Sequence, residues 1–197
     1  MAPIASTLAL GAGCYWGTEK FIINDFQKIH PGSIVDAKVG FMSAKENAKA
    51  NPSYEQVCTG KTGHVEVLNI KLRPNSDDDS ADGTTDPEVF ESLIRFFFMF
   101  HDPTTLNRQG NDAGSQYASV IFCSDEAQRK IATRVKKELQ DGIDGRKVTT
   151  YENPTVETEI NDYTEFFPAR DSHQNYLGKN PSGYCNHRIR LRDWPKL

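Results

Sequence analysis

The chain of 197 residues has few cysteines, little excess charge and no long apolar run. Its four cysteines are too few for a disulfide scaffold, so we expect each to be catalytic or simply buried. A formal net charge of −4 argues against a nucleic-acid partner, which needs a basic face. No stretch approaches the ~20 apolar residues of a membrane span, and residues 1–10 lack the pattern of a secretion signal. These absences favour a cytoplasmic monomer that binds neither nucleic acid nor membrane.

The chain does carry enough apolar residues for one sizeable core, since 37% of it is hydrophobic and 10% aromatic. Alternating apolar residues predict strands, and apolar residues at helical spacing predict helices. Strands are expected at residues 7–12, 35–41, 65–72, 116–123, 147–151 and 156–160, and helices at 16–30, 88–101, 124–140 and from about 172. Loops are expected at residues 43–53 and in the acidic stretch 75–83. Because strands and helices are intermixed without a repeat or linker, the class is α/β or α+β, and residues 1–197 form a single domain.

Residues 11–21 carry the strongest chemical signal, because a strand ends in glycines and a helix begins directly after Cys14. Helix N–H groups aimed at a thiolate would lower the pKa of Cys14 and make it more nucleophilic. Gly13 and Gly17 leave space beside the sulfur, and Tyr15 and Trp16 offer apolar walls. On these residues alone, a buried structural cysteine in a strand-to-helix turn remains an equal alternative.

Residues 13–17 (GCYWG) resemble the GCFWG signature of the A-type peptide-methionine sulfoxide reductases, with Tyr15 in place of the usual Phe. Further blocks resemble that family's motifs in the same order. They lie at residues 54–66, 101–105, 109–117, 173–177 and 180–185. The resemblance therefore covers nearly the whole chain. It implies a two-layer α+β sandwich with a mixed sheet and a ferredoxin-like core, with the cysteine at the strand-to-helix turn.

The resemblance also implies the reaction, which is reduction of methionine (S)-S-oxide, free or in proteins, without a cofactor. Cys14 would attack the sulfoxide sulfur and become a sulfenic acid, while Glu66 donates a proton. Tyr54 and Tyr117 would donate hydrogen bonds to the sulfoxide oxygen. The alternation in residues 65–72 independently places Glu66 on an apolar face, where partial desolvation raises its pKa. A solvated glutamate on an edge strand is the alternative for that pattern.

The same resemblance names the substrate-binding set and assigns no metal. Tyr15 and Trp16 would hold the substrate's ε-methyl group. Asp112 would hold the substrate backbone or a water, and it could also form an Asx turn in residues 111–114, since both roles are compatible. His173 and Tyr176 complete the set. His173 is interpreted as a positioning group and not as a metal ligand, since no second ligand cluster with zinc spacing is present in the sequence.

Cys185 is expected to resolve the sulfenic acid from a mobile tail at about 179–197. The resemblance implies a Cys14–Cys185 disulfide that thioredoxin reduces. Many family members carry a further cysteine in the tail, but none follows Cys185, so a two-thiol relay is expected. Cys58 and Cys123 are predicted to be packing residues.

Two departures from the family pattern stand out, Ala118 in place of an arginine and an altered segment at residues 41–43. Three other functions stay open at this point. A thiol peroxidase could use Cys14 and Cys185, and a cysteine hydrolase could use Cys14 with His173. The third is a non-catalytic domain that captures oxidised methionine peptides.

Overall fold

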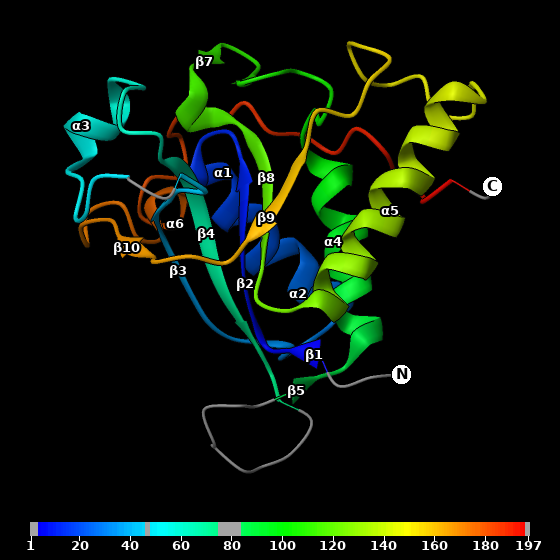
Figure 1. Cartoon of the computed structure of the whole chain (residues 1–197), viewed down its shortest axis with the longest axis horizontal. Coiled ribbons are helices and arrows are strands. Elements are labelled where there is room, and N and C mark those ends of the chain that lie inside the picture. Colours follow the sequence, from blue (N-terminus) through cyan, green and yellow to red (C-terminus); the bar gives the residue numbers. More distant parts are fainter. Residues whose placement is uncertain (1–3, 46–47, 75–83, 196–197) are drawn as a thin grey trace.

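A computed structural model describes residues 4–45, 48–74 and 84–195, and it contains a six-stranded sheet at its centre (Figure 1). The sheet order is β10-β3-β4-β2-β8-β9, with antiparallel pairs throughout apart from the parallel pair β8–β9. Its strands are β2 (Thr7–Ala12), β3 (Ile34–Met42), β4 (Val65–Leu72), β8 (Ser119–Cys123), β9 (Glu159–Asp162) and β10 (Phe167–Pro168). The mixed sheet of the predicted fold class is therefore confirmed.

Short strands and helices complete the described chain. Two ribbons pair β1 (Ile4–Ala5) with β5 (Thr84–Thr85), and β6 (Arg108–Gln109) with β7 (Asp112–Ala113). The helices are α1 (Tyr15–Lys20), a π-helical turn (Phe21–Phe26), α2 (Gln27–Ile29), α3 (Tyr54–Cys58), α4 (Pro87–Phe100), a 3₁₀ turn (Ser115–Tyr117), α5 (Glu126–Asp144) and α6 (Tyr176–Lys179). None of the helices in the described ranges is long and apolar enough to cross a membrane.

The two faces of the sheet are covered differently, as strand alternation requires. Leu8 and Leu10 of β2 point into a large core shared with the apolar sides of α1, α4 and α5. Ala9 points to the other face, into a smaller cluster that Tyr163 and Phe166 cover. Both aromatics belong to the segment between β9 and β10. The backbone of this segment crosses the sheet on its way to β10 (Figure 1). The helices and the sheet thus form the two main layers, with one loop closing the second face.

Sheet pairing brings the ends of three strands together and so positions the site. Because β2 is antiparallel to both β4 and β8, its last residues lie beside the first residues of those strands. Ala12 pairs with Ser119, and a Cβ on Gly11 would lie 3.1 Å from the Glu66 carbonyl. Cys14, Glu66 and Tyr117 therefore meet at one end of the sheet.

Several predicted elements need correction. Residues 147–151 form no strand, the strand predicted at 116–123 begins at Ser119 after a 3₁₀ turn, and the strand predicted at 156–160 is β9. The helix predicted at 124–140 is α5, which begins at Glu126 and is capped by Asp125, whose carboxylate accepts the Gln128 N–H. The last helix begins at Tyr176 and not near residue 172. The acidic loop predicted at 75–83 lies outside the described residues.

The sequence did not predict helix α3. The polar loop that ends at Ser53 hides its start, where Ser53 and Gln56 form a reciprocal capping box. This helix places Tyr54 at the site.

Candidate active site

Cys14 is held where β2 ends and α1 begins. Gly13, directly before it, has a φ of +91°, and a Cβ there would lie 2.4 Å from the Cβ of Gln109, so glycine is required. Cys14 is the N-cap of α1, and its carbonyl accepts the N–H groups of Gly17 and Thr18 at 3.2 and 3.4 Å. The N–H groups of Trp16 and Gly17 also hydrogen-bond the thiol sulfur. The turn thus fixes the sulfur at the helix start, as the sequence predicted.

A cavity of about 180 Å³ opens beside this sulfur. Seven of its lining residues belong to the predicted site, and the eighth was not predicted. They are Cys14, Tyr15, Trp16, Tyr54, Glu66, Asp112, Tyr117 and Tyr184. Residues from positions 14 to 184 therefore share one small chamber.

Glu66 is the buried carboxyl group of the chamber, with 2% of its surface exposed. Its Oε2 accepts the Tyr15 N–H at 3.1 Å. Burial raises the pKa of Glu66 to about 8, and the nearby Asp112 carboxylate adds to this, while the Tyr15 N–H opposes it. The solvated edge-strand alternative is wrong, because β4 lies between β3 and β2. At neutral pH Glu66 is therefore mostly a neutral acid.

The Cys14 thiol is shifted in the direction opposite to the prediction. Burial, followed by the Glu66 carboxylate, raises the pKa of Cys14 above its ordinary value. The Trp16 and Gly17 N–H groups lower it, as expected at a helix start, but they are outweighed. The thiol is therefore held protonated, and it needs a further group to activate it.

Two phenols face the same chamber from α3 and from the 3₁₀ turn before β8. Burial is the main cause that raises the pKa of Tyr54 and Tyr117, so both hydroxyls remain hydrogen-bond donors at neutral pH. The Tyr54 hydroxyl also makes a side-chain hydrogen bond with Cys58, one helical turn further along α3. Cys58 therefore does more than pack, and its spacing of four residues from Tyr54 was the available signal.

Aromatic rings pack against Tyr15 and Trp16, the two aromatic residues of α1 that line the cavity. The Trp16 ring stacks on Tyr176, with centroids 3.7 Å apart. The His173 ring lies 5.8 Å from the rings of Tyr15 and Trp16 and 4.6 Å from that of Tyr54. His173 and Tyr176 are thus in contact with the wall residues but are not among those that line the cavity. Phe41, from the altered segment, is buried 5.9 Å from the Tyr15 ring and belongs to this support.

Asp112 of the β6–β7 ribbon and Tyr184 of the C-terminal tail also line the cavity. Asp112 accepts hydrogen bonds from the Tyr184 hydroxyl at 3.3 Å and from Asn186 Nδ2 at 2.8 Å. The sequence did not predict Tyr184 as a site residue, although it stands next to Cys185 in the predicted tail motif. Cys14 and Cys185 are both half-buried free thiols that pack against the main core. Cys123 is buried in β8, as expected for a packing residue.

Across residues 4–45, 48–74 and 84–195, no group of three or more His, Cys, Asp or Glu side chains is arranged to hold a metal ion.

Comparison with known proteins identifies the family. The family model described as "Peptide methionine sulfoxide reductase" matches residues 6–195. The chain belongs to the peptide methionine sulfoxide reductase family. A curated relative, MsrA of Polynucleobacter asymbioticus, is 39% identical over 186 residues, which are 93% of this chain and 83% of the relative. A "probable peptide methionine sulfoxide reductase" of Schizosaccharomyces pombe is 37% identical over 175 residues, or 89% of each chain.

Solved structures of the family share the fold. Reduced Mxr1 from Saccharomyces cerevisiae superposes with a TM-score of 0.74 at 34% identity, covering 95% of this chain and 93% of Mxr1. Methionine sulfoxide reductase A of Corynebacterium diphtheriae gives 0.64 at 31% identity, covering 93% and 79%. The predicted enzyme class and reaction are confirmed at the level of the family, and the peroxidase, hydrolase and binding-domain alternatives are not favoured.

Proposed function

We propose that this chain reduces methionine (S)-S-oxide, free and in proteins, with Cys14 as nucleophile, Glu66 as acid and Cys185 as resolving thiol. The observation that carries the proposal is that the Cys14 thiol and the largely neutral Glu66 carboxyl line one small cavity. A sulfoxide reductase needs this pair, because attack at sulfur must be matched by protonation of the oxygen.

Binding would place the sulfoxide between the aromatic wall and the hydrogen-bond donors. Tyr15 and Trp16 would hold the ε-methyl group, supported by His173 and Tyr176. Glu66, Tyr54 and Tyr117 would donate to the sulfoxide oxygen inside the cavity that they line. Asp112 would face the substrate's polar backbone, with Tyr184 beside it.

Oxygen transfer would then proceed through the Glu66 carboxyl group. Its proton passes to the sulfoxide oxygen, which makes the substrate sulfur more electrophilic. The Cys14 thiol proton passes to the Glu66 carboxylate as the sulfur attacks, so the raised pKa of Cys14 is overcome only with substrate in place. In the resulting adduct the hydroxyl oxygen passes from the substrate sulfur to Cys14 Sγ and the bond between the two sulfurs breaks. The thiol and the sulfoxide thus become a sulfenic acid and a thioether, so the substrate is reduced by two electrons and Cys14 is oxidised by two.

Recycling would use the tail and an external dithiol. The Cys185 thiol attacks the Cys14 sulfenic acid, a disulfide forms and water leaves. Reduced thioredoxin then exchanges its dithiol for the disulfide. A solved complex of Saccharomyces cerevisiae Mxr1 with Trx2, 23% identical to this chain with a TM-score of 0.52, is what supports this choice of reductant. The mobility of residues 179–197, the monomeric state and the cytoplasmic location stay predictions.

Turnover of matched substrates tests the proposal. With reduced thioredoxin, the chain should convert methionine (S)-S-oxide and leave the R epimer and hydroperoxides largely unused. The Cys14→Ser variant should form no methionine. Full activity in that variant, or faster turnover of hydroperoxide than of the sulfoxide, would overturn it.

A further inference from the structure

His187 lies two residues after Cys185, and its ring is buried against the turn that carries Cys14. Its Nε2 is 2.6 Å from the Ala12 carbonyl, two residues before Cys14. Burial lowers the pKa of His187 to about 4, so the ring is neutral and its Nε2–H donates to that carbonyl. The tail therefore makes a buried hydrogen bond to the end of β2.

Gly17 makes room for this ring on the other side of Cys14. A Cβ on Gly17 would lie 2.0 Å from Nδ1 of His187, so any side chain there would displace the ring. The rings of Phe21 and Phe100 flank it at 6.3 and 5.7 Å. The second glycine of the GCYWG segment thus accommodates the tail, whereas the sequence had suggested space for substrate beside the sulfur.

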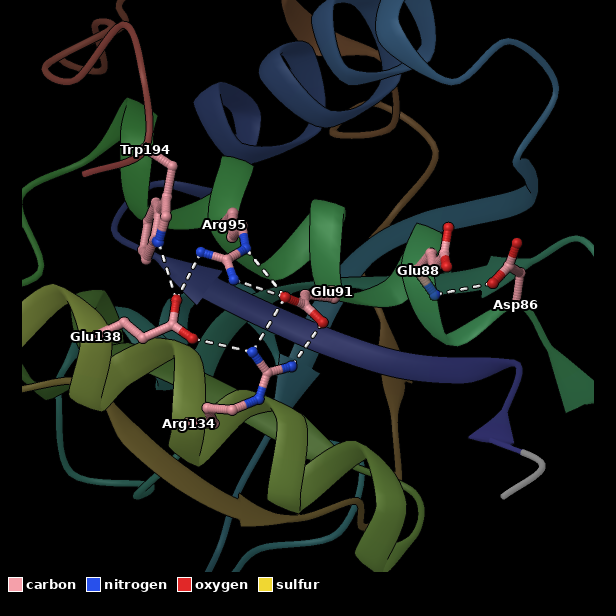
Figure 2. A network of polar contacts seen from close by, with 7 residues as sticks. All are labelled: Asp86, Glu88, Glu91, Arg95, Arg134, Glu138 and Trp194. Atoms are coloured by element: carbon pink, nitrogen blue, oxygen red, sulfur yellow. Dashed lines mark hydrogen bonds and ion pairs between the residues drawn. The ribbon is translucent and has the colours of Figure 1, made fainter. Parts of the chain in front are cut away.

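The chain beyond His187 is also fastened to the core. The N–H groups of Arg188 and Arg190 donate to the carbonyls of Phe100 and Met99, and the Arg190 guanidinium makes a buried ion pair with Asp102 at 3.0 Å. Trp194 donates to Glu138 at 3.0 Å and joins a network between α4 and α5 (Figure 2). Its ring also lies 4.9 Å from the Arg95 guanidinium.

On the other side of Cys185, the contacts are weaker and more exposed. Tyr184 is 46% exposed, and its hydroxyl reaches Asp112 at 3.3 Å. Residues 180–195 contain neither helix nor strand. On the C-terminal side, the half-buried Asn186 donates to Asp112 and to the Gln109 carbonyl, and His187 is the nearest buried contact of the Cys185 segment.

We propose that His187 is a positioning residue that sets the reach of Cys185 to the Cys14 sulfenic acid. The inference rests on the proposed relay between these two cysteines. An extended chain spans at most about 3.6 Å per residue, so Cys185 stays within roughly 7 Å of the His187 backbone however the preceding residues move. Because the His187 ring is tied to the turn that carries Cys14, the resolving thiol keeps a high effective concentration.

Because His187 positions Cys185 only, its loss should affect disulfide formation and leave oxygen transfer nearly unchanged. Oxygen transfer uses groups that line the cavity, and His187 is not among them. In His187→Ala, release of the first equivalent of methionine should stay within about twofold of the parent rate. Formation of the Cys14–Cys185 disulfide should slow at least tenfold, and the Cys14 sulfenic acid should accumulate.

Rapid-quench mass spectrometry on the full chain, with methionine (S)-S-oxide and no reductant, measures both steps. Dimedone traps the sulfenic acid, and alkylation of remaining thiols maps the disulfide. His187→Gln, which keeps an N–H donor of similar reach, should recover most of the disulfide rate, whereas the shorter His187→Asn should not. This pair makes the comparison if His187→Ala does not fold. Ile189→Ala, an exposed position in the same tail, is the matched control and should change neither rate.

Disulfide formation at the parent rate in His187→Ala and His187→Asn would overturn the inference and leave the relay intact. An equal loss in both steps would overturn it as well, because it would show a general structural defect. If the parent chain itself forms no Cys14–Cys185 disulfide, the proposed relay fails and the inference fails with it.

Discussion

The two reactive cysteines are held in different ways. Cys14 is fixed by the backbone, through the pairing of β2 with β4 and β8 and through the positive φ of Gly13. Cys185 lies in a segment without helix or strand, and side chains of its neighbours hold it, namely Tyr184, Asn186 and His187. Sheet register cannot shift without loss of the core, whereas a few side-chain contacts can be exchanged. The first step therefore depends on the fold, and the second depends on a handful of replaceable contacts.

The largest expected effect separates the two cysteines themselves. Cys14→Ser should abolish methionine formation in both single and multiple turnovers, because no other sulfur lines the cavity in the described structure. Cys185→Ser should still form one equivalent of methionine per chain and then stop, unless an external thiol attacks the sulfenic acid directly. Product counted per chain, with and without reductant, checks both. If Cys185→Ser fails to form the first equivalent of methionine, oxygen transfer also depends on Cys185, and the two cysteines do not act in separate steps.

Replacing Glu66 removes the proposed acid from the cavity and leaves the C-terminal segment with Cys185 unchanged. Glu66→Gln should slow oxygen transfer by about 10²–10⁴-fold, the usual contribution of a positioned acid. In the parent, the rate should fall above about pH 8 as Glu66 ionises, and the variant should lose this decline. Single-turnover rates between pH 6 and about 10 measure it. A parent rate that keeps rising through pH 9 would exclude a protonated Glu66 as the donor.

The same substitution should also show in stability. The pKa of Glu66 rises from 4.5 to about 8 on folding, so its stabilising contribution is complete below about pH 4.5 and is lost as the pH rises toward 8. Glu66→Gln has no such loss, and at pH 8 it should exceed the parent by up to about 4 kcal/mol in the free energy of unfolding. Urea unfolding at pH 4.5 and 8 gives the difference. If the difference in the free energy of unfolding between Glu66→Gln and the parent does not widen with pH, burial does not raise the pKa of Glu66 as described.

The smallest effect concerns Tyr15, where this chain departs from the family's phenylalanine. Its hydroxyl is buried and, among the described residues, has no hydrogen-bond partner. Tyr15→Phe should therefore raise the free energy of unfolding by about 1 kcal/mol and change oxygen transfer by less than about twofold. Tyr54→Phe is the matched comparison, because it removes a proposed hydrogen-bond donor to the sulfoxide oxygen and should slow oxygen transfer. A tenfold loss in Tyr15→Phe would instead make that hydroxyl a ligand of the substrate oxygen.

The same contrast explains what could be predicted from the sequence. Strand alternation and the glycine-flanked cysteine are local signals, and they placed Cys14 and the buried Glu66 correctly. The sign of the Cys14 pKa shift was wrong because burial and the Glu66 charge depend on segments far apart in the chain. Tyr184 and His187 were missed because the tail has no periodicity, and its order comes from contacts with β2, α1 and the β6–β7 ribbon.

The mass of the parent chain after exposure to methionine (S)-S-oxide without reductant tests the two-cysteine relay most directly. The chain should lose two hydrogens, mapped to a Cys14–Cys185 disulfide, and release one methionine per chain. An unchanged mass, or a disulfide that involves Cys58 or Cys123 in place of Cys185, would contradict it.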